Sequence, residues 1–133
     1  DKAGLAHADY TVSSSNEIQT VVESMIGKVD VIYAPTDNTI AAGMATVASV
    51  ATDNKIPIIC GEENMVNEGG LATYGIDYYQ LGYMAGEQAV EILKDGKNPA
   101  DIPIGYLSAD KCTIAVNQET ADTLGIDVSS VKK

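Results

Sequence analysis

The chain has 133 residues and a formal net charge of −11, with 19 acidic side chains against 8 basic ones, all of which are lysine. This balance excludes the basic patches that nucleic acids and anionic membranes require, and a hydrophobic content of 45% excludes a disordered chain. The length predicts one domain with a core of its own. That core should be aliphatic, because Phe and Trp are absent.

Short apolar runs alternate with helical patterns along most of the chain. Runs rich in β-branched residues predict strands, and apolar residues at helical spacing predict helices. Ser14 and Glu17 have the spacing of a capping box at the start of the first helix. In chain order the predicted elements are a strand at 7–12, a helix ending at Gly27, a strand at 29–34 buried on both faces, a helix at 39–54, a strand at 56–60, a short helix through Met65 and Val66, a strand at 71–76 and a long helix at 78–95 capped by Asp77.

From about residue 95 to the end of the chain, the regular alternation of strand and helix patterns stops. A loop rich in turn residues occupies 95–103. Two short strands are predicted at 104–107 and 112–116, on either side of the sequence SADK. A last short helix is predicted to begin after Asn117 and to end at Gly125.

The alternation of strand and helix determines the fold class. Consecutive strands separated by helices run parallel and are joined by right-handed crossovers. The sequence therefore predicts an α/β fold with three layers and a mainly parallel, doubly wound sheet. In such sheets, ligands bind beyond the carboxyl ends of the strands.

Polar residues follow four of the predicted strands, at what would be one edge of the sheet. The segments are SSSN (13–16), PTDN (35–38), GEEN (61–64) and IDYY (76–79). Each opens a helix, and helix N-termini attract a carboxylate through their unpaired N–H groups. Acidic side chains at the same edge would attract an ammonium group, so both poles of a zwitterion could be bound. The candidate ligand-binding residues are Thr36, Asp37, Asn38, Glu62, Glu63, Asn64, Tyr74 and Asp77.

A plainer interpretation of the same residues is helix capping. Ser, Thr, Asp and Asn are ordinary N-caps, each worth about 1 kcal/mol, and Tyr33 and Tyr74 could equally be core residues. Glu62 and Glu63 are expected to be poor N-caps, which favours a ligand role for them.

Catalytic signals are few. His7 is the only histidine, and Cys60 and Cys112 lack metal-ligand spacing and are expected to be small buried hydrophobes. No nucleophile elbow, P-loop or dinucleotide motif occurs, and the pair Glu62–Glu63 has no partner base. We therefore expect no enzyme activity, no metal and no cofactor. No window has the pattern of a transmembrane span or a signal peptide.

Three stretches carry a family resemblance: VDVIYAPTDNTIAAGM, IPIICGEENMVNEGGLATYGIDYYQLGYMAGEQAVEILKDG and VNQETADTLGI. Together with the intervening residues, over about 10–126, they resemble the substrate-binding proteins of a bacterial ABC-transporter family. Members of this family are usually periplasmic or lipid-anchored, and some are linked to tryptophan and other aromatic amino acids. The resemblance implies a two-lobed, type I periplasmic binding fold that clamps its ligand between the lobes.

The resemblance also implies a domain organisation. Residues 1–133 would be a single domain fragment from the C-terminal part of such a protein, with 7–76 as the core of an incomplete second lobe and 77–133 as the hinge-recrossing helix and C-terminal strands and helix. Family members are more than twice this length. The strand that would lie between 7–12 and 29–34 has no counterpart here, nor has the first lobe.

The function implied is that of an extracytoplasmic solute-binding component of an ABC importer, with a membrane permease as partner. The implied ligand is an amino acid, and the residues support its zwitterionic character better than they support an aromatic side chain. The fragment is expected to bind weakly alone and to self-associate through surfaces that a missing lobe would cover. Two alternatives remain open: a sugar-binding or sensing domain of the same fold, against which the absence of arginine argues, and a flavodoxin-like enzyme or signalling receiver, against which SSSN at the first strand end argues.

Overall fold

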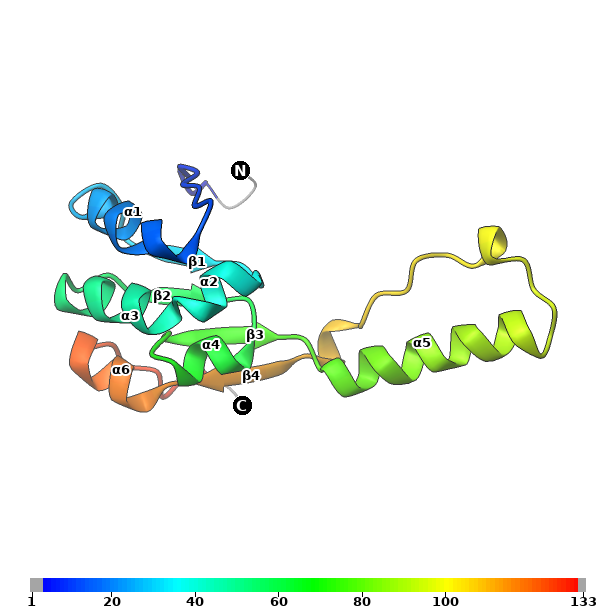
Figure 1. Cartoon of the computed structure of the whole chain (residues 1–133). Coiled ribbons are helices and arrows are strands. Elements are labelled where there is room, and N and C mark those ends of the chain that lie inside the picture. Colours follow the sequence, from blue (N-terminus) through cyan, green and yellow to red (C-terminus); the bar gives the residue numbers. More distant parts are fainter. Residues whose placement is uncertain (1–3, 132–133) are drawn as a thin grey trace.

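A four-stranded sheet organises the computed structural model, which describes residues 4–131 (Figure 1). The strands lie in the order β1-β2-β3-β4. β1, β2 and β3 are parallel, and β4 runs antiparallel to β3. The predicted α/β fold with a mainly parallel sheet is therefore confirmed. The strands are β1 (Ile32–Ala34), β2 (Ile58–Cys60), β3 (Ala72–Gly75) and β4 (Thr113–Val116).

Helices follow the strands as the alternating pattern predicts. Asp77 caps the long helix and Asn117 the last one, and Gly125 ends the last one in the left-handed conformation with φ of 74°, as expected. Residues 4–131 also contain three 3-10 turns: η1 (Ser15–Glu17), η2 (Pro99–Asp101) and η3 (Ala109–Lys111). The α-helices are α1 (Ile18–Met25), α2 (Asn38–Ala42), α3 (Met44–Asp53), α4 (Glu63–Asn67), α5 (Tyr78–Leu93) and α6 (Gln118–Leu124).

The core lies on one face of the sheet. Aliphatic side chains of α1, α3 and α4 pack there against alternate residues of the strands, such as Ile32 and Ile58. The intervening residues point to the opposite face, where Tyr33 is 67% exposed and Ile59 and Tyr74 are also exposed. The expectation that the strand at 29–34 is buried on both faces is therefore wrong, because its alternate side chains face solvent.

Several predicted elements differ in the structure. Residues 7–12 form no strand, since no described neighbour offers a backbone ladder, although Tyr10 and Val12 still pack against the core. The segment 104–107 is likewise not a strand. The capping box is shifted: the Glu17 carboxylate accepts from the N–H of Ser13, and the Ser14 side chain makes no cap bond.

The helix predicted over 39–54 is broken at Gly43 into α2 and α3. A Cβ at Gly43 would lie 2.3 Å from Cδ1 of the buried Ile18. Glycine therefore lets the chain approach α1 closely at this point, and its low helix propensity favours the break.

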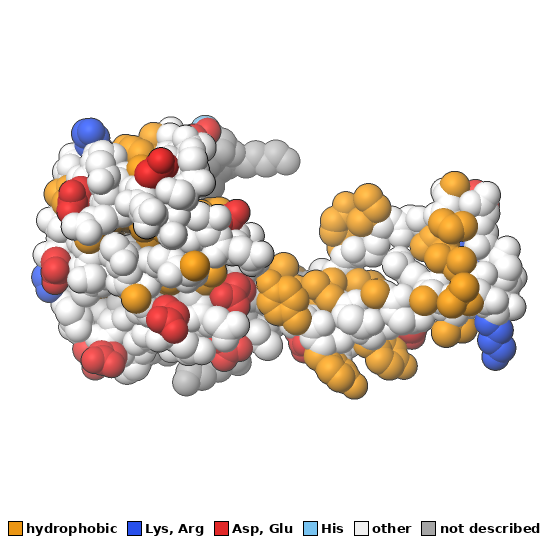
Figure 2. Space-filling model, in the orientation of Figure 1, with side chains coloured by type: hydrophobic (Ala, Val, Ile, Leu, Met, Phe, Trp, Pro, Cys, Tyr) orange, Lys and Arg blue, Asp and Glu red, His pale blue; other side chains and the backbone are white. Residues whose placement is uncertain are grey.

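Residues 76–112 project from the rest of the chain; we call them the arm, and residues 4–75 and 113–131 the sheet body (Figure 1). α5 forms one side of the arm and has no buried residue. The returning segment packs along it, with Gln88 donating to the carbonyl of Pro103 at 3.3 Å. Apolar side chains cover much of the arm's visible surface (Figure 2). No helix in the described part of the chain is long and apolar enough to cross a membrane.

Candidate functional site: the polar edge of the sheet

The polar segments after β1 and β2 lie against each other. The ladder continues one residue past the strands, because the N–H of Gly61 donates to the carbonyl of Ala34 at 2.9 Å. A Cβ at Gly61 would lie only 2.5 Å from Oγ1 and 2.6 Å from the backbone nitrogen of Thr36. The structure thus brings 35–38 and 61–64 together at the carboxyl edge, as the parallel topology predicts. We call these two segments the rim.

Asp37 is the N-cap of α2. Its Oδ1 accepts from the backbone N–H groups of Thr39 at 2.8 Å and Ile40 at 3.1 Å. The side chains of its neighbours Thr36 and Asn38 are exposed and make no hydrogen bond to any residue between 4 and 131. The capping interpretation therefore holds for Asp37, while one hydroxyl and one amide beside it keep free donors and acceptors.

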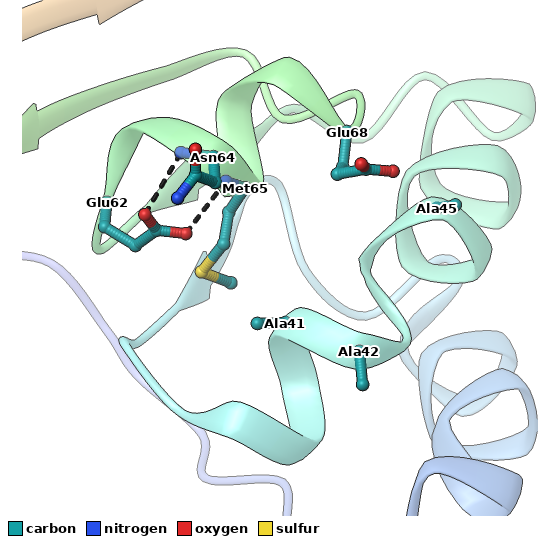
Figure 3. A pocket seen from close by; sticks show the side chains of 7 residues that line it. All are labelled: Ala41, Ala42, Ala45, Glu62, Asn64, Met65 and Glu68. Carbon is teal, nitrogen blue, oxygen red and sulfur yellow. Dashed lines mark hydrogen bonds between the residues drawn. The ribbon is translucent and has the colours of Figure 1, made fainter.

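Glu62 caps α4, which corrects the expectation that it would be a poor N-cap. Its two carboxylate oxygens accept separately from the N–H groups of Asn64 at 3.1 Å and Met65 at 3.0 Å (Figure 3). The backbone of Glu62 is extended, with φ of −156° and ψ of 165°, so the longer side chain can fold back onto the helix start. Only 9% of Glu62 is exposed. Glu63, in the first helical turn, is exposed.

The charge of Glu62 affects the neighbouring thiol. Burial, and secondarily the Glu62 carboxylate, raise the pKa of Cys60 from 9.0 to about 11. A thiol with such a pKa remains protonated near neutral pH and is a poor nucleophile. Cys60 therefore behaves as the small buried hydrophobe that the sequence indicates, and Cys112 is also free but only partly buried.

A hollow of about 350 Å³ opens between α4 and the helices α2 and α3. Glu62 and Asn64 belong both to the rim and to the lining of this hollow. The side chain of Met65 points toward Ala41 on the other side of the hollow (Figure 3). The alanines and Glu68 were not among the residues predicted for the site, although the run of small residues at 41–43 was a usable signal. The lining residues are Ala41, Ala42, Ala45, Glu62, Asn64, Met65 and Glu68.

The last two candidates, Tyr74 and Asp77, lie where the sheet body meets the arm. The pairing of Cys60 with Thr73 leaves Tyr74 and the residues after it beyond the end of β2. Asp77 caps α5 by accepting from the N–H of Gln80 at 3.1 Å. The Tyr74 hydroxyl donates to the carbonyl of Ala109. These two residues thus belong to the junction with the arm and not to the contact between the first two polar segments.

The described residues contain no group of three or more His, Cys, Asp or Glu that could hold a metal ion. The rim offers helix N-termini, carboxylates, amides and hydroxyls. Such groups suit the recognition of a small polar ligand.

A family model and a curated relative match most of the chain. The sequence model of the family described as "ABC transporter substrate binding protein" matches residues 1–131. A curated relative, the "Tyrosine-binding protein" of Clostridioides difficile (strain R20291), is 48% identical over 113 residues. This match includes 85% of the chain and 32% of the relative, so the chain spans about a third of the relative's length.

Solved structures agree with this assignment. An ABC domain from Streptococcus pneumonia in complex with L-Trp is 40% identical, with a TM-score of 0.82 over 97% of this chain and 43% of that one. The ligand-free, open structure of a substrate-binding protein with adhesive properties from Clostridium difficile is also 40% identical, with a TM-score of 0.72 over 98% and 43% of the two chains. A conserved domain protein from Vibrio cholerae is 29% identical, with a TM-score of 0.82 over 97% and 43%. The chain therefore belongs to the ABC transporter substrate-binding protein family.

Proposed function

We propose that this chain forms part of the extracytoplasmic solute-binding component of an ABC importer and contributes one side of a site for an amino acid. The observation that carries the proposal is the contact between the segments 35–38 and 61–64, which sets two helix N-termini and their acidic residues at one edge. One relative is named as tyrosine-binding and another was solved with L-Trp. Both ligands are zwitterions, the class that such an edge suits.

Each candidate residue has a role in this proposal. The amides and hydroxyls hydrogen-bond the ligand's carboxylate or ammonium, and the acidic side chains attract the ammonium. Asp37 and Glu62 can do so while capping, because an ionised carboxylate has lone pairs beyond the two that each cap uses. The proposed contact residues are Thr36, Asp37, Asn38, Glu62, Glu63, Asn64, Tyr74 and Asp77.

The rim is one half of the proposed site. We propose that residues 7–76 are the core of one lobe and that the segment 77–133 returns through the hinge, with the arm docking on a second lobe. Matches that cover 43% of each solved relative support this arrangement. Closure of two lobes on the ligand would then produce the form recognised by a membrane permease. Within the extracytoplasmic location proposed above, we propose more narrowly that the protein is lipid-anchored at the outer face of the membrane.

The same arrangement has a consequence for the chain in isolation. Tyr79, Leu93 and Tyr106 on the arm are 76%, 85% and 81% exposed. Apolar surface of this kind favours association, so we propose that the 133-residue chain self-associates through the arm. Light scattering over a range of concentrations tests this, and Leu93→Lys should weaken the association. A monomer at every concentration would contradict it.

Ligand binding is tested by NMR titration of the isotopically labelled chain, because chemical shifts report even millimolar affinity. L-tyrosine and L-tryptophan should shift the amides of 36–38 and 62–64, and Asp37→Asn should reduce the effect. D-glucose serves as the control ligand. A response to the sugar and not to the amino acids would replace this proposal by the sugar-binding alternative, and the absence of any response at the rim would contradict both. Micromolar affinity would refute the view that the rim is only half of the site.

A further inference from the structure

Two crossings of the backbone connect the arm to the sheet body. The chain leaves the sheet after Gly75 at the end of β3 and returns at Thr113, the first residue of β4. These two residues are register partners in the antiparallel ladder. The arm is therefore carried by a narrow two-stranded ribbon (Figure 1). Such a ribbon can twist and bend unless other contacts hold it.

The arm is held together internally. Gln88 on α5 donates to the carbonyl of Pro103 on the returning segment. Gly105 lies so close to α5 that a Cβ there would be 3.0 Å from Sδ of Met84. Lys97 and Glu91 form an ion pair at 2.6 Å. These contacts order the arm as one unit but do not determine its angle to the sheet body.

One side-chain hydrogen bond within residues 4–131 joins the arm to the sheet body. The Tyr74 hydroxyl, on β3, donates to the backbone carbonyl of Ala109, in η3. Tyr74 pairs with Ile114 across the ladder, so its side chain reaches along the returning strand toward η3. The bond bridges 35 positions of sequence and links a residue of the sheet body to a residue of the arm.

We propose that Tyr74 is a positioning residue whose hydroxyl holds the arm at one angle to the rim. The inference rests on the proposed function, in which the arm docks on the second lobe, and it gives the Tyr74 hydroxyl a structural task in addition to its proposed contact with the ligand, since a hydroxyl that donates can still accept. Removal of the hydroxyl leaves the Tyr74 ring and the β3–β4 ladder in place. The equilibrium between the held arm and a freely swinging arm should then shift by about 2- to 12-fold, the range for one net hydrogen bond.

The test uses the 133-residue chain without ligand, at a concentration where light scattering shows a monomer, so that its outcome is independent of ligand binding and of self-association through the arm. Residual dipolar couplings of backbone amides compare the orientation of α5 with that of α3 in the wild type, in Tyr74→Phe and in Tyr106→Phe. Tyr106→Phe is the matched control, because Tyr106 is 81% exposed and its hydroxyl makes no hydrogen bond to a described residue. Amide exchange of Lys111 and Cys112, which donate within η3, gives a second measurement.

In the wild type and the control, α5 and α3 should fit one alignment tensor. In Tyr74→Phe the couplings of α5 should shrink, and the η3 amides should exchange about 2- to 12-fold faster while the β3–β4 ladder amides keep their rates. Three results would overturn the proposal: a wild-type arm that already moves independently, couplings in Tyr74→Phe that equal those of the wild type, and an equal loss of couplings in Tyr106→Phe. Faster exchange with unchanged couplings would show a local bond that positions nothing.

Discussion

The contact between the two rim segments can be tested by one methyl group. Gly61 has no side chain, and a Cβ there would lie 2.5 Å from Oγ1 and 2.6 Å from the backbone nitrogen of Thr36, with the carbonyl carbon of Pro35 at 3.1 Å. The hydroxyl could rotate away, but the backbone nitrogen could not. Gly61→Ala must therefore push the segment 35–38 away from 61–64.

Overpacking of this kind costs about 1–3 kcal/mol. At roughly 4 °C per kcal/mol for a chain of this size, the thermal midpoint should fall by about 4–12 °C. Circular dichroism or calorimetry measures the midpoint. Gly82→Ala is the control, because a Cβ at this position of α5 meets nothing within 4 Å, and alanine there should raise helix stability by about 1 kcal/mol.

A Gly61→Ala midpoint equal to that of the wild type would contradict this contact. That result would mean that the two segments do not touch in solution. The rim would then lack the geometry on which the proposed ligand site depends, whatever the behaviour of the control.

Three further predictions concern single side chains. Asp37→Ala should lose about 1 kcal/mol of stability through the lost cap, whereas Asp37→Asn should keep most of it; equal losses in urea denaturation would contradict the capping role. Iodoacetamide at about pH 8 should label Cys112 in the native chain and spare Cys60, which is 2% exposed, and mass spectrometry would reveal the opposite result. Above about pH 9 the unfolded Cys60 thiol ionises before the folded one, whose pKa is about 11. The free energy of unfolding should therefore fall as the pH rises from about 9 to about 11, and it should fall less steeply in Cys60→Ala. Equal slopes of unfolding free energy against pH in the two proteins would contradict this.

Most of the local structure could be predicted because it depends on nearby residues. The caps at Asp37, Asp77 and Asn117 follow from the hydrogen bonds that short polar side chains make to the next helical turn. The parallel order of β1, β2 and β3 follows from the alternation of strands and helices. These features need no knowledge of distant parts of the chain.

The errors involve residues whose structure depends on distant partners. A strand at 7–12 needs a neighbouring strand, and the break at Gly43 reflects packing against Ile18. The edge position of the candidate site followed from the predicted topology. The cap made by Glu62 required an extended backbone, and the bond between Tyr74 and Ala109 required the return of β4 beside β3; composition and spacing reveal neither.

The adjacency of Gly75 and Thr113 also makes the pairing of β3 with β4 largely independent of the length of the arm. Closing a chain loop becomes costlier by only about 0.6 kcal/mol for each doubling of its length. The whole arm is roughly three doublings longer than a tight hairpin loop, so carrying it costs the β3–β4 pairing about 2 kcal/mol. Insertions or deletions within the arm change this figure very little. The length and sequence of the arm can therefore follow the demands of the proposed second lobe, while the sheet that carries the rim keeps its register.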